Sequence, residues 1–183
     1  MEWDQEINHA TDGDSQESYL CLDSDVAKDL YGDEIDSDWR FNYQLEEKYY
    51  GYYYRTLKYY KQTENKDEGK ISNRTLPMIR MSEVYYIAAE AIFDTNPKEA
   101  QGYLELVKKG RGISKKFDNV TNKSEFINLL VNDARREFLG EGQIFYMYKR
   151  LNRLMPASSF YDSDVLPTDE NMVLPKPDSE SNI

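Results

Sequence analysis

Two apolar segments separated by a strong helix-start signal constrain the fold of this chain more than any other feature. The first segment lies between residues 76 and 93 and repeats apolar side chains at a 3.6-residue spacing. Asn96, Pro97 and Glu99 then match an N-cap, a first helical residue and a capping box. A second apolar stripe follows over residues 98–109. The spacing therefore predicts a helical hairpin, close in length to one tetratricopeptide unit.

A third long helix is predicted to start near Asn122, where Glu125 provides a second capping box. Its apolar stripe continues past the Gly140-Glu141-Gly142 sequence to about residue 151, so we expect a kink or close packing at the glycines. A single helical hairpin cannot bury its own apolar face, so the hairpin needs neighbours. Left uncovered, this face is expected to promote dimers.

The remaining sequence predicts less regular structure. Residues 1–40 are rich in turn-forming residues, with one short helix around Asp25–Tyr31, and residues 41–60 favour one or two strands. Residues 152–170 are predicted to be irregular and the tail after Val173 extended. The expected fold is mainly α, a tetratricopeptide-like hairpin plus a third long helix, with irregular loop-rich segments and a minor β-ribbon. The division expected is an acidic, tyrosine-rich segment, 1–75, and a helical scaffold, 76–183, within one domain.

The acidic charge is confined to one part of the chain. The net charge is −11, and residues 1–40 contain thirteen acidic and two basic side chains, whereas the rest is balanced. An acidic segment beside a neutral body argues against nucleic acid and anionic lipid as partners. The only cysteine, Cys21, and the only histidine, His9, argue against an internal disulfide, against metal sites built from cysteine or several histidines, and against histidine-based catalysis. We therefore expect no metal or cofactor, and no apolar run is long enough to span a membrane.

Two groups of side chains are candidates for function. The first is tyrosine, because ten of the sixteen tyrosines lie between residues 19 and 60. Tyrosine suits half-wet surfaces, so this region is either a β-ribbon packed on the body or a ligand platform. The second is the charged group Arg135, Arg136, Glu137 and Glu141. Its two glutamates lie four residues apart and could act as an acid–base pair, but a structural ion-pair network is the favoured interpretation, with no catalytic residue.

Three segments resemble the SusD/RagB family in sequence, order and spacing. They are LPMIRMSEVYYIAAEA (76–91), DARREFLGEGQIFYMYKR (133–150) and VLPKPDSE (173–180). A looser resemblance begins near Asp29, and Lys108 and Arg111 stand where the family often has an Arg-x-x-Arg pair. The resemblance covers the C-terminal portion of a family member. We therefore expect the chain to be truncated from a longer protein that carries the signal peptide and the lipid-bearing cysteine.

The resemblance implies a non-enzymatic lipoprotein on the outer-membrane surface. Such a protein captures glycans or peptides and passes them to a TonB-dependent, SusC-like transporter. In this family, aromatic side chains stack on sugar rings and polar neighbours bind hydroxyls. The candidates here are Trp39, Tyr52, Tyr53 and Tyr54, with Arg40 and Asp38 as polar neighbours. The alternative function is a tetratricopeptide-type scaffold for protein–protein contact without a small ligand of its own.

Overall fold

The computed structural model describes residues 21–48, 51–58, 78–117, 119–156 and 163–173. The chain divides into two compact units, Met1–Gly140 and Glu141–Ile183. The expected boundary between residues 75 and 76 lies outside the described residues. As predicted, the described structure is mainly helical with a small sheet. The first unit contains, in order, β1 (Cys21–Asp23), α2 (Ser24–Tyr31), the 3-10 turn η2 (Gly32–Glu34), α3 (Trp39–Gln44), β2 (Leu45–Lys48), β3 (Tyr53–Thr56), α4 (Met81–Ile92), α5 (Pro97–Lys109) and α6 (Lys123–Glu137).

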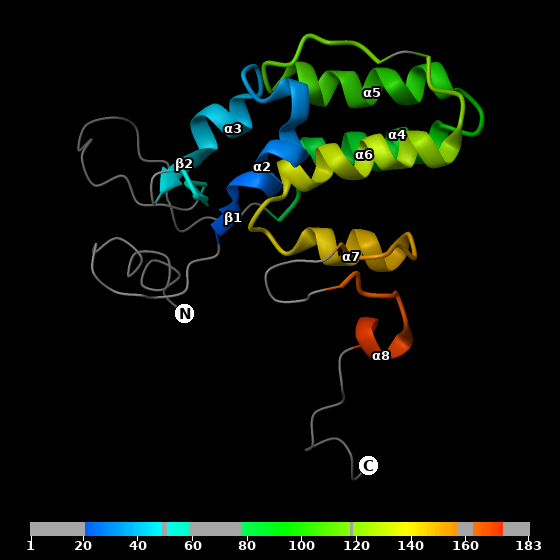
Figure 1. Ribbon diagram of the computed structural model, residues 1–183. Coiled ribbons are helices and arrows are strands. Elements are labelled where there is room, and N and C mark those ends of the chain that lie inside the picture. Colours follow the sequence, from blue (N-terminus) through cyan, green and yellow to red (C-terminus); the bar gives the residue numbers. More distant parts are fainter. Residues whose placement is uncertain (1–20, 49–50, 59–77, 118, 157–162, 174–183) are drawn as a thin grey trace. The chain divides into compact units, whose positions relative to one another are not determined.

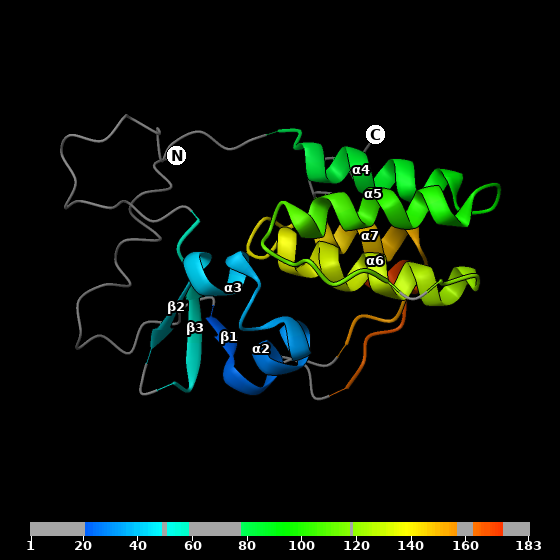
Figure 2. The ribbon, with the colours of Figure 1, turned by 90° about the horizontal axis from the view of Figure 1, so that it is seen from above.

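The predicted helical hairpin is confirmed as α4 and α5, which lie side by side in Figures 1 and 2. The connection is stabilised by the predicted capping box. The Asn96 side chain accepts a hydrogen bond from the Glu99 backbone N–H at 3.2 Å, and its amide donates to the Glu99 carboxylate at 2.9 Å. Pro97 is the first residue of α5. The local sequence therefore determines where the hairpin turns.

The third helix starts where predicted, because Asn122 accepts a hydrogen bond from the Glu125 N–H at 3.0 Å. It ends at Glu137, so the prediction that it continues to about residue 151 is wrong. Gly140 and Gly142 adopt φ angles of +78° and +73°, in the left-handed region that a continuous helix cannot contain. The stripe resumes in a separate helix, α7 (Gln143–Arg150), which belongs to the second unit.

The core of the first unit lies between α4, α5 and α6. Phe93, just after α4, stacks on Phe126 of α6 with ring centroids 4.4 Å apart. Nearer the end of α6, Tyr86 meets Phe138 edge to face at 5.8 Å. A smaller apolar cluster contains Leu30, Tyr31 and Leu45 and lies between α2 and the sheet. Residues of all three long helices are thus buried, which meets the expected need of the hairpin for a neighbour.

The sheet is antiparallel with strand order β1–β3–β2, so the first strand in sequence pairs with the last. The short helix predicted around Asp25–Tyr31 is present as α2, and two strands occur within residues 41–60. Helix α3 was not predicted, because β-forming residues dominate its sequence. Asp38 starts it as an N-cap, which accepts a hydrogen bond from the Arg40 N–H at 2.9 Å.

The second unit is described only in part. Helix α7 follows Gly142, and an antiparallel bridge joins Met155 to Val165 through two backbone hydrogen bonds of 3.1 and 2.8 Å. Between the bridge and Val173 lies the short helix α8 (Asp169–Met172). Residues 163–168 otherwise lack a helix or long strand, as predicted for this irregular region.

Candidate functional site

Arg40 occupies the centre of a buried cluster of charges. The Asp38 N-cap starts α3, and the Arg40 side chain turns inward, where it is 1% exposed. Its guanidinium donates to both Asp38 carboxylate oxygens, at 2.9 Å from Nε and 2.8 Å from Nη2. Nη2 also lies 2.8 Å from Asp133 Oδ1, and Nη1 lies 3.4 Å from Glu137 Oε2. One buried cation is therefore shared by three carboxylates, which offsets the large cost of burying each charge alone.

The two acidic residues of α6 connect this cluster to the hairpin. Asp133 and Glu137 lie one helical turn apart, so both face inward. Asp133 accepts a hydrogen bond from the Tyr86 hydroxyl of α4 at 2.6 Å. Glu137 accepts two hydrogen bonds from Arg111, at 2.8 and 2.6 Å, just beyond α5. The cluster thus links α3, α4, α6 and the end of α5.

The cluster lowers the pKa of the Glu137 carboxyl and raises the pKa of the Tyr86 hydroxyl. Burial alone raises the pKa of Glu137, but the hydrogen bonds and charge of Arg111, aided by Arg40 and Arg80, outweigh it and lower the pKa to about 2. Burial raises the pKa of the Tyr86 hydroxyl, and the neighbouring Asp133 carboxylate raises it further. Glu137 therefore remains ionised and Tyr86 neutral near neutral pH. A general acid needs a pKa near the working pH, so the Glu137 geometry fits an ion pair better than proton transfer.

A second set of ion pairs surrounds Glu34 at the end of η2. Its two carboxylate oxygens lie 2.5 Å from Lys108 of α5 and 2.5 Å from Arg136 of α6. Arg136 also donates from Nε to the Leu30 carbonyl at 2.8 Å. Burial raises the pKa of Glu34, but the hydrogen bonds from the two cations outweigh it and lower the pKa. These contacts fix the α2–η2 segment against the long helices.

Trp39 projects outward between two buried neighbours. Its side chain is 52% exposed, whereas Asp38 and Arg40 are buried. The Trp39 backbone N–H donates to the Arg111 carbonyl at 2.8 Å. Its indole lies directly against Gly112, where an added Cβ would stand 2.4 Å from Nε1. Tyr43 lies one helical turn further along α3, on the same side, and is 73% exposed.

The family model of the SusD family matches residues 36–172, a range that includes the whole of α3 to α8. The chain belongs to the SusD family. Proteins of this family bind nutrients rather than catalyse reactions, and they are generally associated with the outer membrane. No curated protein and no solved structure matches the chain.

The tyrosines predicted to bind sugar in this SusD-family chain divide between surface and interior. Tyr52 and Tyr53, at the turn into β3, are exposed. Tyr54 is half-buried on the opposite side of the strand and packs on Phe41, with ring centroids 5.0 Å apart. Phe41 in turn meets Tyr31 at 5.1 Å. Tyr54 therefore packs on the body, as expected for a β-ribbon, whereas Tyr52 and Tyr53 stay predicted ligand contacts.

The two polar neighbours predicted for Trp39 lie in the interior instead. Asp38 and Arg40 use their polar atoms on each other and on α6, so neither side chain can reach a ligand in solution in this arrangement. The reason is the helical turn that Asp38 starts, which rotates both residues away from Trp39. The sequence prediction also missed Tyr43, although its four-residue spacing from Trp39 is the signal of a shared helical face.

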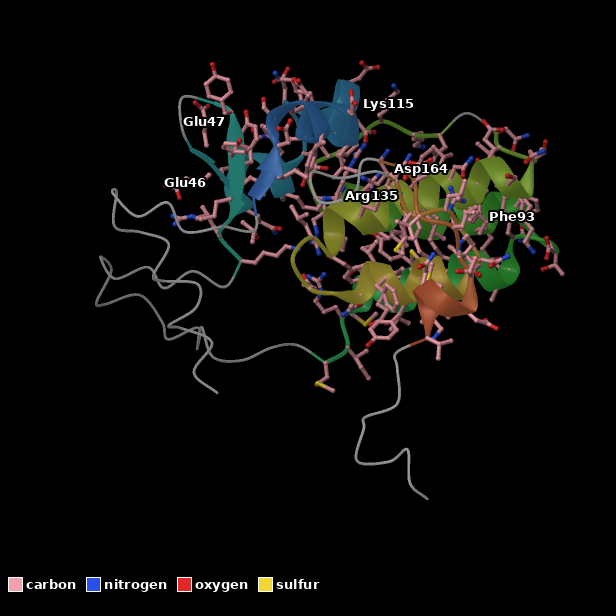
Figure 3. All side chains as sticks on the ribbon, turned by 60° about the horizontal axis from the view of Figure 1, so that its bottom comes forward. Glu46, Glu47, Phe93, Lys115, Arg135 and Asp164 are labelled. Atoms are coloured by element: carbon pink, nitrogen blue, oxygen red, sulfur yellow. The ribbon has the colours of Figure 1, made fainter. Side chains whose placement is uncertain are left out.

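Of the four charged residues predicted to form an ion-pair network, two make buried ion pairs with described residues. Arg136 and Glu137 take part in buried pairs. Arg135, labelled on α6 in Figure 3, makes no ion pair with the residues that the structure describes. Glu141 begins the second unit. The cations that complete the two sets of ion pairs come from distant segments: Arg40, Lys108 and Arg111.

A cavity of about 340 Å³ lies beside the ion pairs of Glu34, between η2, the loop after α5 and α6. The loop contributes Phe117 and Lys115 to the lining, and Figure 3 labels Lys115. The charged lining residues are balanced, so the cavity favours neither anions nor cations: Lys108, Lys115, Lys116, Arg136, Asp33, Glu34, Glu125 and Asp133. Within the described ranges there is no cluster suited to a metal ion, and no helix there has the length and apolarity to cross a membrane.

Proposed function

We propose that this SusD-family protein captures glycans at the cell surface for uptake through a TonB-dependent, SusC-like outer-membrane transporter. In this proposal it is a surface-exposed lipoprotein, and the transporter and the glycan are its two partners. Membership of a nutrient-binding family supports uptake as the general role. The choice of glycans rests on the aromatic side chains exposed on α3 and at the turn into β3.

The observation that carries the proposal is the presentation of Trp39. A large aromatic side chain that is half exposed between two fully buried neighbours is held in place by the interior of the protein. Tyr43 extends the same face of α3 by one turn, and Tyr52 and Tyr53 add a second exposed aromatic group. Aromatic rings offer an apolar surface at little cost in side-chain entropy, which suits the apolar faces of sugar rings.

The test is glycan binding by wild type and by Trp39→Ala. A glycan array identifies a ligand, and isothermal titration calorimetry then measures its dissociation constant. We expect Trp39→Ala to weaken binding by about tenfold or more, as truncation of a central aromatic contact does at other interfaces. Tyr146→Ala is the matched control, because Tyr146 is an exposed aromatic residue of the second unit, and its effect should stay below about twofold. Equal binding by wild type and Trp39→Ala would contradict the assignment of Trp39.

A second candidate function is a tetratricopeptide-type scaffold for protein–protein contact. It is favoured by the outer face of α4, where Met81, Val84 and Ile87 are exposed together. A large exposed apolar patch is typical of a surface that binds another protein. Tight binding of the transporter together with an absence of glycan binding on the array would support the scaffold and overturn glycan capture.

A further inference from the structure

We propose that Gly112 is a positioning residue that fixes the angle of the Trp39 indole for ligand stacking. The inference rests on the proposed glycan-binding function, because it explains how one aromatic contact could be preorganised. Gly112 does not touch the ligand in this proposal. It acts through Trp39, by allowing the indole to lie against the backbone of a rigid turn.

The space at Gly112 is filled by the neighbouring segment. A Cβ built there would lie 2.4 Å from Trp39 Nε1, 2.5 Å from Cδ1 and 2.7 Å from the Ser37 carbonyl oxygen. The residue also has a φ of +87°, which side chains other than glycine rarely adopt. Two independent constraints thus require glycine where the indole rests.

The turn that carries Gly112 is itself held on both sides. Backbone hydrogen bonds close it, from Arg111 and Ile113 to the Lys108 carbonyl at 2.9 and 3.1 Å. The Arg111 side chain is fixed by its two hydrogen bonds to Glu137.

The Trp39 side of the contact is anchored to the same carboxylate. Glu137 also pairs with Arg40, the residue that follows Trp39. The Arg111 carbonyl meanwhile accepts the Trp39 N–H. The residue that follows Trp39 and the turn that contacts its indole are therefore both held by one buried carboxylate, that of Glu137 on α6. Such preorganisation lowers the entropy that ligand binding must overcome.

The test compares Gly112→Ala with Gly142→Ala. Gly142 has a similarly positive φ of +73° but nothing within 4 Å of a built Cβ, so it controls for backbone strain without the clash. Both are made in a Trp3→Phe background, because the chain has two tryptophans and Trp39 is then the only one left. The readouts are Trp39 emission and its quenching by acrylamide, the glycan dissociation constant, and helix content by circular dichroism.

We expect Gly112→Ala to shift Trp39 emission, increase its quenching and weaken glycan binding by about tenfold, while helix content is retained. Gly142→Ala should leave emission unchanged and binding within about twofold. The double variant Gly112→Ala/Trp39→Ala should bind glycan as weakly as Trp39→Ala alone, because Gly112 acts only through the indole. Unchanged emission and binding in Gly112→Ala would overturn the proposal.

Two further comparisons decide the proposal if Gly112→Ala does not fold or if wild type binds no glycan. If Gly112→Ala loses its helix content, Arg111→Ala loosens the same turn, and it should increase Trp39 quenching whereas Lys109→Ala, an exposed neighbour, should not. Equal quenching in those two variants would overturn the proposal that this turn positions the indole. If wild type binds no glycan, glycan capture fails, but the emission and quenching of Trp39 still decide whether Gly112 positions the indole.

Discussion

The two halves of α6 are equally buried but are held by different forces. Near its start, Phe126 and Leu130 pack among apolar side chains, and Phe126 stacks on Phe93. Near its end, Asp133 and Glu137 are held by the guanidinium groups of Arg40 and Arg111. The helix therefore has an apolar half and an ionic half within about three turns.

The difference indicates which half of α6 tolerates substitution and which half does not. Apolar contacts are non-directional, so neighbouring side chains can partly relax around a change. Buried charges have no such freedom, because removal of one partner leaves another charge without compensation in a medium of low polarity. The ionic half also holds the segments that present Trp39, namely α3 and the turn at Arg111. The proposed binding surface thus depends on the less tolerant half.

The largest expected effect is the loss of stability in Arg40→Ala. This change leaves the buried carboxylates of Asp38, Asp133 and Glu137 without their shared cation. We expect the free energy of unfolding to fall by about 3–5 kcal/mol, measured by urea denaturation followed by circular dichroism. Arg135→Ala is the control, since Arg135 has no ion pair with the described residues, and its effect should be under about 0.5 kcal/mol. Similar losses in both variants would refute the special role of Arg40.

Acid should weaken the ionic half next. The pKa of Glu137 is about 2 in the folded chain, against 4.5 for an unperturbed glutamate. Because the folded pKa is the lower one, the stabilisation is fully present above about pH 4.5 and is lost as pH falls toward 2. The loss is on the order of 3 kcal/mol. Denaturation curves between pH 6 and 2 would measure it, and Glu137→Gln should flatten this dependence. An equally steep dependence in Glu137→Gln would assign it to other groups.

A change in the apolar half should cost less. Phe126→Leu keeps an apolar side chain but gives up the stacking contact with Phe93. We expect a loss of about 1 kcal/mol, with partial relaxation of the surrounding side chains. Urea denaturation at several pH values should give curves parallel to those of wild type, because no titrating group is disturbed. A loss as large as that of Arg40→Ala would remove the contrast between the two halves.

The sequence predicted the apolar half of this arrangement far better than the ionic half. The caps at Asn96 and Asn122 are local signals, read from residues three positions apart, so the helix starts were predictable. The buried cluster joins Arg40 to Asp133, a separation of 93 residues that no local pattern encodes. Within α6, spacing indicated which charged residues share a face, but not which distant cations meet them.

The surface around Trp39 shows the same limit. Its residue type makes Trp39 a candidate ligand contact, and its side chain is half exposed. Adjacency in the sequence predicts Asp38 and Arg40 as its polar neighbours. Because Asp38 is the N-cap of α3, the helix begins there and the three side chains point in different directions. Trp39 points outward, and its two neighbours point into the interior. The contact of Trp39 with Gly112 spans 73 positions and depends on the folded turn after α5.

The smallest expected effect on stability concerns the outer face of α4, which belongs to neither half of α6. Met81, Val84 and Ile87 (59% exposed) form an apolar stripe on this face. We expect it to drive self-association, since an exposed apolar stripe gains by being covered. Size-exclusion chromatography with light scattering should show a mass that rises with concentration. Ile87→Glu should give a monomer with stability changed by less than about 0.5 kcal/mol. Lys98→Glu, an exposed change on α5, should leave association unaltered. A wild-type monomer at every concentration would show that the exposed stripe on α4 is not enough to join two copies of the chain.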